Sequence, residues 1–372
     1  MKYRFDQIAT NSTAKKKPVD ADKEHYIGLE HIDSECLTIT RWGSDVAPTG
    51  EKLIMHKGDV LFGKRRAYQR KVGIAPFDGI FSAHGMVLRP QTDVIDESFF
   101  PFFISSDQFM ERAVRISVGG LSPTINWKDL KEQEFELPPL SEQRVLANKL
   151  WASYRLKESY KKLLKATDEM VKSQFIEMFG NCLQVEKLSS LCDTFLDGDW
   201  IESKDQSDEG IRLVQTGNVG NGIFKNKEDK CRFISDKTFD RLHCTEIFSG
   251  DILVSRLPDP IGRACMIPNG LGRMITAVDC SIIRLKESIL PDFFIAYTMT
   301  PTYRAQINEV TTGTTRRRVS RANLGNVKVP VPPMEQQQQF VSIAHQADKS
   351  KFELQKSIDA IDAVIKSLIN NN

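Results

Sequence analysis

Two long stretches of the chain place apolar residues at alternating spacings of three and four, the pattern of a coiled-coil seam. The first follows Pro139 and reaches Phe179, and the second follows Pro333 and reaches Ile369. Neither stretch contains an internal Pro or Gly, and Gly180 closes the first. We therefore predict two long helices whose paired seams consist of Leu156, Tyr160, Leu163, Met170, Ile343, Leu354, Ile361 and Leu368.

Both predicted helices begin behind the same short motif. The chain reads Leu137-Pro-Pro-Leu-Ser-Glu-Gln143 before the first helix and Val331-Pro-Pro-Met-Glu-Gln-Gln337 before the second. The prolines end an extended segment, and Ser141 is the expected N-cap of the first helix. At 1.5 Å per residue, about 38 residues make a rod of roughly 57 Å.

The sustained spacing favours pairing of the two helices with each other. If the two halves of the chain are related by a pseudo-twofold axis, the helices run antiparallel and hold the globular parts at opposite ends. The alternative is two separate amphipathic helices, each lying on its own globular domain.

The segments outside the two helices also repeat. Both read as short strands and turns with a few helices, and their landmarks recur in the same order while the loop contents change. The corresponding pairs are 27–32 with 213–219, 58–61 with 250–253, 86–89 with 282–285, 99–103 with 291–294, and 119–120 with 311–316. We predict an α+β (mixed α/β) fold of two similar globular domains, 1–137 and 181–331, separated by helical spacers at 138–180 and 332–372.

Composition limits the class of protein. A chain of 372 residues with 40% hydrophobic and 27% charged residues has room for two or three ordinary globular domains. The densest apolar run, 99–104, is far too short to span a bilayer, and the N-terminus lacks the apolar core of a signal peptide. Seven cysteines without a CxxC pair argue against a disulfide framework or a structural zinc site. We expect a cytoplasmic protein without membrane association.

The familiar catalytic motifs are missing. The segment 58–65 nearly matches a P-loop, but Arg65 stands where Ser or Thr would bind Mg²⁺, and Val60-Leu-Phe62 reads as a buried strand. The two Pro-Pro pairs lack the preceding polar residue of a DNA methyltransferase motif, and Pro258-Asp259 lacks the later acidic residue and lysine of a nuclease. We therefore expect no catalytic residue and no metal site.

Basic loops carry a positive signal instead. Each half has an arginine-rich cluster in a turn-rich segment, whereas the net charge of the chain is only +2. Arginine and lysine contact phosphate or guanine, and Asn and Gln can read adenine. A solvated charged loop is the alternative for one cluster, but two clusters favour DNA contact. The candidate DNA-binding residues are Lys64, Arg65, Arg66, Tyr68, Gln69, Arg70, Lys71, Asn126, Arg256, Arg263, Arg273, Thr314, Thr315, Arg316, Arg317 and Arg318.

The repeat, the Pro-Pro helix starts and the basic loops together resemble the specificity (S) subunit of type I restriction-modification systems. The segment 58–70 looks like a signature of the first target-recognition domain of that family. The segments 137–143 and 173–180 look like the start and the end of its central helical region, and 311–316 resembles a loop common in its domains. The glutamine-rich start at 335–339 departs from the first copy. The resemblance covers essentially the whole chain.

The resemblance implies a non-catalytic subunit that reads a bipartite, asymmetric sequence in double-stranded DNA. Each target-recognition domain would read one half-site, and the helix pair would set the unread spacer. The family's partners are two modification subunits, which methylate adenine with S-adenosylmethionine, and restriction subunits that use ATP and Mg. No cofactor is expected in this chain. The remaining alternatives are a stand-alone nuclease and a coiled-coil scaffold that does not bind DNA.

Overall fold

The computed structural model describes residues 1–314 and 317–370, and the chain forms two compact units. Unit 1 comprises 1–162 with the chain from 355 onward, and unit 2 comprises 163–354. Each long helix therefore contributes one end to each unit, whereas the predicted domain boundaries at 137 and 331 precede the helices. The fold mixes helices and sheets in both units, in agreement with the predicted class.

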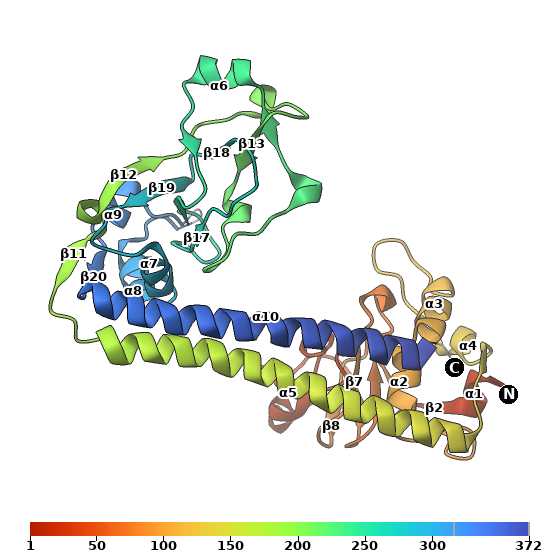
Figure 1. The fold of residues 1–372 in the computed structure, drawn as a ribbon. Coiled ribbons are helices and arrows are strands. Elements are labelled where there is room, and N and C mark those ends of the chain that lie inside the picture. The colour runs from red at the N-terminus through yellow and green to blue at the C-terminus, as the bar shows by residue number, and fades with distance from the viewer. Residues whose placement is uncertain (315–316, 371–372) are drawn as a thin grey trace. The chain divides into compact units, whose positions relative to one another are not determined.

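Unit 1 contains two four-stranded sheets and a two-stranded ribbon (Figure 1). The first sheet has the order β2 (Ala9–Ser12), β9 (Met86–Pro90), β6 (Val60–Phe62), β7 (Val72–Ile74). The second has the order β3 (Lys15–Lys16), β5 (Lys52–Met55), β8 (Gly79–Phe81), β4 (Tyr26–Ile27). The ribbon pairs β1 (Lys2–Arg4) with β10 (Glu134–Glu136). The short helices are α1 (Phe5–Ile8), α2 (Phe100–Ser105), α3 (Asp107–Arg115) and α4 (Trp127–Leu130), with 3₁₀ turns at η1 (Asp20–His25), η2 (Leu29–His31) and η3 (Ala67–Gln69).

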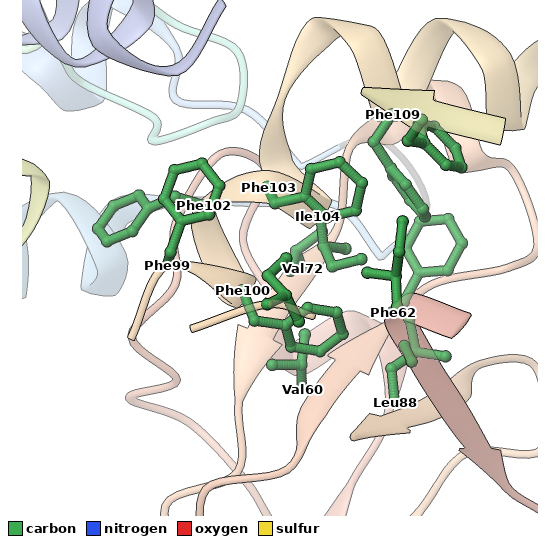
Figure 2. Close-up of a cluster of buried hydrophobic side chains, with 14 of the residues drawn as sticks. Val60, Phe62, Val72, Leu88, Phe99, Phe100, Phe102, Phe103, Ile104 and Phe109 are labelled. Atoms are coloured by element: carbon green, nitrogen blue, oxygen red, sulfur yellow. The ribbon is translucent and has the colours of Figure 1, made fainter. Parts of the chain in front are cut away.

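The first sheet of unit 1 is covered by the helices that follow β9. All three residues of β6 are buried, as expected for a continuous apolar strand. Figure 2 shows the cluster of Phe and aliphatic side chains that joins β6, β7 and β9 to α2 and α3. Phe109 lies within 5.4 Å of the Phe62 ring centroid, at an edge-to-face angle. Burying each such side chain stabilises the fold by about 1.5–3 kcal/mol.

Unit 2 repeats this plan. Its sheets have the orders β12 (Cys192–Asp197), β19 (Cys280–Leu285), β16 (Ile252–Ser255), β17 (Ala264–Met266), and β14 (Phe233–Ile234), β13 (Ile211–Val214), β18 (Met274–Thr276), β15 (Glu246–Ile247). The ribbon pairs β11 (Val185–Lys187) with β20 (Lys328–Pro330). The helices are α6 (Asp236–Leu242), α7 (Pro291–Thr298), α8 (Pro301–Val310) and α9 (Arg321–Gly325), with 3₁₀ turns at η4 (Leu188–Leu191), η5 (Ser203–Asp205), η6 (Thr216–Asn218) and η7 (Glu228–Lys230).

An ion pair between a buried aspartate and a half-buried arginine marks the repeated frame in both units. The Arg89 guanidinium donates two hydrogen bonds to Asp59, at 2.7 and 2.9 Å, and Arg284 does the same to Asp251, at 2.8 and 2.9 Å. Both aspartates follow a turn glycine, in the Gly-Asp landmarks at 58 and 250. The correspondence of Arg89 with Arg284 is one position away from the alignment of 86–89 with 282–285, because β-strand register and not sequence spacing sets it.

The second sheets share three strands and differ in the fourth. In both units a parallel pair (β4 with β8, β13 with β18) is flanked by an antiparallel strand, β5 or β15. In unit 1 the fourth strand, β3, adds beside β5. In unit 2 the fourth strand, β14, adds at the opposite edge, beside β13, and leads into α6.

The two long helices are α5 (Leu140–Phe179) and α10 (Met334–Asn370). α5 begins at Leu140, so Ser141 lies inside the first turn and the predicted N-cap is wrong. The amides of Glu142 and Gln143 bond to the carbonyl of Pro139, which occupies the cap position instead. A proline carbonyl can accept these hydrogen bonds as well as the carbonyl of any other residue. Proline only lacks a side chain that could cap the helix.

The recurring glutamine of the Pro-Pro motif is buried in both units. Gln143 accepts a hydrogen bond from the Asp96 amide at 2.8 Å and donates to the carbonyls of Val94 and Pro138. Gln337 accepts from the Leu290 amide at 2.9 Å and donates to the carbonyls of Ser288 and Pro332. Each glutamine therefore ties the start of a long helix to the loop that precedes α2 or α7. We refer to these contacts as the glutamine clamps.

Contacts between α5 and α10 occur within each unit (Figure 1). In unit 2, Lys351 Nζ lies 2.8 Å from the Asp168 carboxylate, and the Phe175 and Phe340 rings meet edge to face at 5.1 Å. These two pairs follow opposite directions along the two helices, so the helices run antiparallel there. In unit 1, Lys157 forms an ion pair with Asp362.

The structure contradicts part of the predicted seam on α5. Leu156, Leu163 and Met170 are 45%, 50% and 49% exposed. Half-buried or buried side chains next to them, Tyr154, Leu164 and Val171 among them, face inward instead. Apolar residues occupy two adjacent stripes of α5, and the spacing alone selected the wrong stripe. Tyr160, Ile343, Leu354, Ile361 and Leu368 are half-buried, and their role in the seam remains a prediction.

Candidate nucleic-acid interface

The basic segment 64–71 of unit 1 is a loop that joins β6 to β7. Its 3₁₀ turn, η3, is flanked by Arg66 and Arg70, both in the left-handed backbone region with φ of 56° and 51°. Such a conformation is uncommon for arginine and bends the loop sharply at both ends of the turn. Tyr68, inside the turn, is 55% exposed. The loop therefore presents an aromatic ring and polar side chains to solvent.

A second loop packs against this one. The amide of Val118 bonds to the carbonyl of Thr124 at 3.0 Å and the reverse bond is 2.9 Å, which closes a hairpin. The amide of Arg66 bonds to the Pro123 carbonyl at 2.8 Å, and the Arg66 Nε donates to Ser122 Oγ at 3.1 Å. The structure therefore brings Arg65, Arg66 and the predicted glycine loop at 119–120 to one surface.

Two of the predicted DNA-binding residues of unit 1 are used inside the unit. Arg70 lies 2.6 Å from the Asp107 carboxylate and donates to the Ser105 carbonyl, and Lys71 Nζ donates to the Leu29 carbonyl at 2.6 Å. These bonds fasten the end of the loop to α3 and to η2. The geometry argues against a DNA contact for Arg70 and Lys71, because Arg70 is paired with the Asp107 carboxylate and Lys71 Nζ is held by the Leu29 carbonyl.

Lys64 and Asn126 lie elsewhere, at a cavity of about 340 Å³ between β2, β3 and the start of α4. The cavity is also lined by Asn11, Thr13 and Lys15. Partial burial, and secondarily the charge of Lys15, lowers the pKa of Lys64. An ammonium in such a place is stabilised by an anion. Sequence analysis missed Asn11, Thr13 and Lys15, whose only signal was membership in a polar, lysine-rich segment.

The equivalent loop of unit 2, 256–263, has its arginines inside the protein. Arg263 is 6% exposed and donates hydrogen bonds to the carbonyls of Thr216, Val219, Leu257 and Pro260 at 2.7–3.0 Å. Arg256 is 3% exposed, lies 3.5 Å from the Asp197 carboxylate and donates to the Val278 carbonyl. The predicted DNA contacts of Arg256 and Arg263 therefore disagree with the structure, because burial of both side chains leaves them without access to a duplex.

The other predicted residues of unit 2 lie at the surface. Arg273 forms ion pairs with Asp236 at 2.6 Å and Glu246 at 3.0 Å, and its guanidinium stacks over Phe239, so it is already well partnered. Thr314, Arg317 and Arg318 are exposed in the hairpin closed by the backbone bonds between Thr312 and Arg318. Thr315 and Arg316 lie outside the described residues.

The hairpins 118–124 and 312–318 occupy corresponding places. Each follows α3 or α8, and each leads into the strand-to-helix connection before α4 or α9. The amides of Ile125 and Val319 bond to the carbonyls of Lys64 and Arg256, at 3.0 and 3.2 Å. In both units the hairpin therefore lies beside the first residue of the loop after β6 or β16.

The described residues show neither a metal-binding group nor a membrane-spanning helix. Within 1–314 and 317–370, no three His, Cys, Asp or Glu side chains come together as a metal-binding group. Over the same residues, none of the helices combines the length and the apolar character needed to cross a bilayer.

Comparison with known proteins places the chain in a family. The family model for the type I restriction modification DNA specificity domain matches twice, at residues 5–166 and 183–361. The EcoDI specificity subunit of a type I restriction enzyme from Escherichia coli is 30% identical over 149 residues, which are 40% of this chain and 33% of that protein. A putative specificity subunit, MjaX, from Methanocaldococcus jannaschii is 21% identical over an alignment that covers 100% of this chain and 91% of that protein.

Solved structures agree on the fold. One, from work on the assembly and conformational transition of a type I restriction-modification system, has a TM-score of 0.61 at 18% identity and covers 99% of this chain and 96% of its own. The S subunit from M. genitalium has a TM-score of 0.54 at 15% identity, with 99% and 94% covered. The chain therefore belongs to the family of type I restriction-modification specificity subunits, and it carries the family's DNA specificity domain twice.

Proposed function

We propose that this chain reads a bipartite, asymmetric sequence in double-stranded DNA, with one half-site for each specificity domain. The pair of helices α5 and α10 would set the length of the unread spacer. The chain would dock two modification subunits, which supply the S-adenosylmethionine-dependent methylation of adenine, and it would itself catalyse no reaction. Restriction subunits that use ATP and Mg would complete the system.

One observation carries the proposal: the two units share a frame and differ in their exposed loops. The shared parts are the glutamine clamps, the paired Asp and Arg of the first sheets, and the hairpins at 118–124 and 312–318. The loop 64–71 presents Arg65, Arg66 and Tyr68, whereas 256–263 buries its arginines. A repeated frame with two different surfaces suits two different half-sites, since base readout depends on side chains placed in a groove.

The exposed stripe on α5 supports the docking of partners. Leu156 in unit 1, and Leu163 and Met170 in unit 2, are large apolar side chains about half exposed at heptad spacing on one helix face. An apolar stripe on a helix is a typical interaction surface. We propose that modification subunits cover it, because a chain without methylation chemistry of its own needs them.

Co-expression with the neighbouring modification subunit, followed by genome-wide mapping of methylated adenines, tests the proposal. We expect one asymmetric, two-part motif with a fixed gap. Exchange of 257–262 and 312–318 for unrelated loops, with the buried Arg256 and Arg263 retained, should change one part of the motif and leave the other part and the gap unchanged. Methylation by the chain without partners, or a motif that changes in both parts, would refute the proposal.

Matched insertions test the role of the helices. Seven residues added to both α5 and α10, after Lys162 and before Gln355, lengthen each helix by about 10.5 Å. Because a heptad preserves the side-chain phase, the pairing can survive the insertion. We expect the gap in the motif to grow by about three base pairs, at ~3.4 Å each. An unchanged gap would show that the helices do not set it.

A further inference from the structure

Lys64, which follows Gly63 at the end of β6, corresponds to Arg256, the first residue after β16, yet their surroundings differ in charge. The backbone carbonyl of Lys64 accepts a hydrogen bond from the Ile125 amide, and that of Arg256 accepts one from the Val319 amide. In unit 2, the Asp197 carboxylate lies 3.5 Å from Arg256 and 3.7 Å from Arg321, so the chain itself supplies an anion at this place. In unit 1, the described residues place no carboxylate against Lys64.

Strand register identifies the residue that makes this difference. Asn11 pairs with Leu88 across β2 and β9, and Phe195 pairs with Ile283 across β12 and β19. Leu88 and Ile283 in turn face the first residues of β6 and β16, so Asn11 and Phe195 correspond. Two positions further along the same face, Thr13 corresponds to Asp197.

The two substitutions open a cavity in unit 1. The Phe195 ring packs against the core of unit 2 and lies close to Gly325. Asn11 is smaller and polar, and its Oδ1 is buried without a hydrogen-bond partner in the described part of the chain. Asn11, Thr13, Lys15, Lys64 and Asn126 all line the resulting cavity of about 340 Å³. Unit 1 therefore has an open, polar and cationic cavity where unit 2 has a ring and an ion pair.

The charge of this cavity is not satisfied by the chain. The carboxylate of Glu51 lies 4.0 Å from Lys15 Nζ, and both side chains are about half exposed, 49% and 58%, so water screens the pair. Two ammonium groups facing one cavity repel each other unless an anion lies between them. Lysine ammonium groups, a side-chain amide and a hydroxyl can all donate hydrogen bonds to the oxygens of a phosphate.

We propose that this cavity of unit 1 binds a phosphate of the DNA backbone, with Lys15 and Lys64 as the charged donors. Thr13 supplies a neutral hydrogen bond, and Asn126 supplies another with the Nδ2 hydrogen that it does not donate to Asp129. Within the described part of unit 2, the Asp197 carboxylate takes the place of the anion. The two specificity domains therefore grip DNA differently, with an additional phosphate clamp in unit 1. This inference rests on the proposed DNA-reading function and names one chemical group that unit 1 contacts.

The sharpest variant places the carboxylate of unit 2 into unit 1. Thr13→Asp should fill the anion site with the chain's own charge, as Asp197 does, and Lys64→Gln and Lys15→Gln should each remove one cation. Lys57→Gln is the matched control, because this exposed lysine lies before β6, at the opposite end of that strand. Thermal unfolding of each variant shows whether it folds like the wild-type chain.

The measurement is DNA affinity of the complex of the full chain with its modification subunit, titrated between 50 and 200 mM salt. We expect Thr13→Asp to weaken binding by roughly tenfold and each lysine variant by about three- to tenfold, with the salt slope reduced by about one. Single methylphosphonate substitutions, which neutralise one phosphate at a time, should weaken the wild-type complex at one position in the first half-site, and not the Thr13→Asp or Lys64→Gln complex.

The outcomes separate the two levels of the proposal. If the wild-type complex shows no sequence-specific binding, the proposed function fails. If it binds specifically and Thr13→Asp, Lys15→Gln and Lys64→Gln behave like Lys57→Gln, only the phosphate site is refuted. Loss of binding that follows a base change and is insensitive to every methylphosphonate would make the cavity a base-reading site, and this result would also overturn the inference.

Discussion

The loops 64–71 and 256–263 have the same backbone frame but expose different side chains. In both, the backbone closes in the same way: the Gly63 amide bonds to the Lys71 carbonyl and the Ser255 amide bonds to the Arg263 carbonyl, each at 2.9 Å. The last residue of each loop also has the same task. Lys71 donates to Leu29 in η2, and Arg263 donates to Thr216 in η6.

Between these fixed ends the loops have nothing in common. The first contains Arg65, Arg66 and Tyr68, and the second contains Leu257 and the run Pro258-Asp-Pro260. A basic residue at the end of the loop therefore has a structural role in both units, whereas a basic residue in the middle is free to meet a ligand. Position within the loop, and not charge alone, separates the two roles.

The largest effect is expected from removing the structural arginine of unit 2. Arg263→Ala would leave four carbonyls, that of the buried Val219 among them, without this donor and should lower the free energy of unfolding of unit 2 by about 3 kcal/mol. Lys71→Ala removes a single bond and should cost about 1 kcal/mol. Hydrogen exchange of the amides in β13 and β18 for Arg263→Ala, and in β4 and β8 for Lys71→Ala, measures the two costs, with Arg317→Ala as a control. A stable Arg263→Ala protein that has lost DNA affinity would reverse the assignment.

The glutamine clamps should be equally important in both units. Gln143→Leu and Gln337→Leu each leave one amide and two carbonyls without a side-chain partner in a buried place, and we expect a loss of about 2 kcal/mol in either case. Urea denaturation gives the values. A loss confined to one variant would show that the frame is less symmetrical than its hydrogen bonds indicate.

Removing the exposed arginines of the first loop should affect DNA and not stability. Arg65→Ala and Arg66→Ala are each expected to reduce DNA affinity by about three- to tenfold and to flatten its salt dependence, while Asp259→Ala in the corresponding loop should not reduce affinity. Titrations of the complex with its modification subunit at several salt concentrations provide the test. An equal salt slope for all three variants would remove the loop 64–71 from the interface.

The smallest effect distinguishes adjacent positions of α5. Leu163→Ser changes an exposed side chain and should alter the free energy of unfolding by less than about 0.5 kcal/mol. Leu164→Ser changes its half-buried neighbour and should cost more, about 1 kcal/mol. Thermal unfolding compares them, and affinity for the modification subunit should fall for Leu163→Ser alone. If Leu163→Ser were the less stable variant, Leu163 would belong to the helix-pair seam, as the apolar spacing predicts.

The repeat, the fold class and the two long helices could be predicted from the sequence, because apolar spacing and recurring landmarks are properties of the chain itself. The fate of individual charges could not. In the sequence, Arg256 and Arg263 have the pattern of exposed basic residues. In the fold, strands distant in sequence bring the Thr216 carbonyl of η6 to Arg263 and the Asp197 carboxylate to Arg256. The phase of the α5 seam was equally hidden, since Leu163 and Leu164 satisfy the spacing almost equally well.

The cavity proposed to bind phosphate in unit 1 shows a further limit of prediction from sequence. Asn11, Thr13 and Lys15 precede Lys64 by half of the first domain, and only the pairing of β2 with β9 and β9 with β6 places them together. No local motif encodes a juxtaposition of this kind. The equivalent register in unit 2 gives a different answer because single side chains differ at the same places.

The glutamine clamps contact main-chain atoms only. Gln143 and Gln337 recognise amides and carbonyls that every sequence with the same backbone path would offer, apart from a proline at the donor position. These contacts therefore do not depend on the side chains of the attached domain. A whole domain could therefore be replaced by another of the same backbone, and the helix would accept it; under the proposed function, this exchange would give the complex a new half-site in one step.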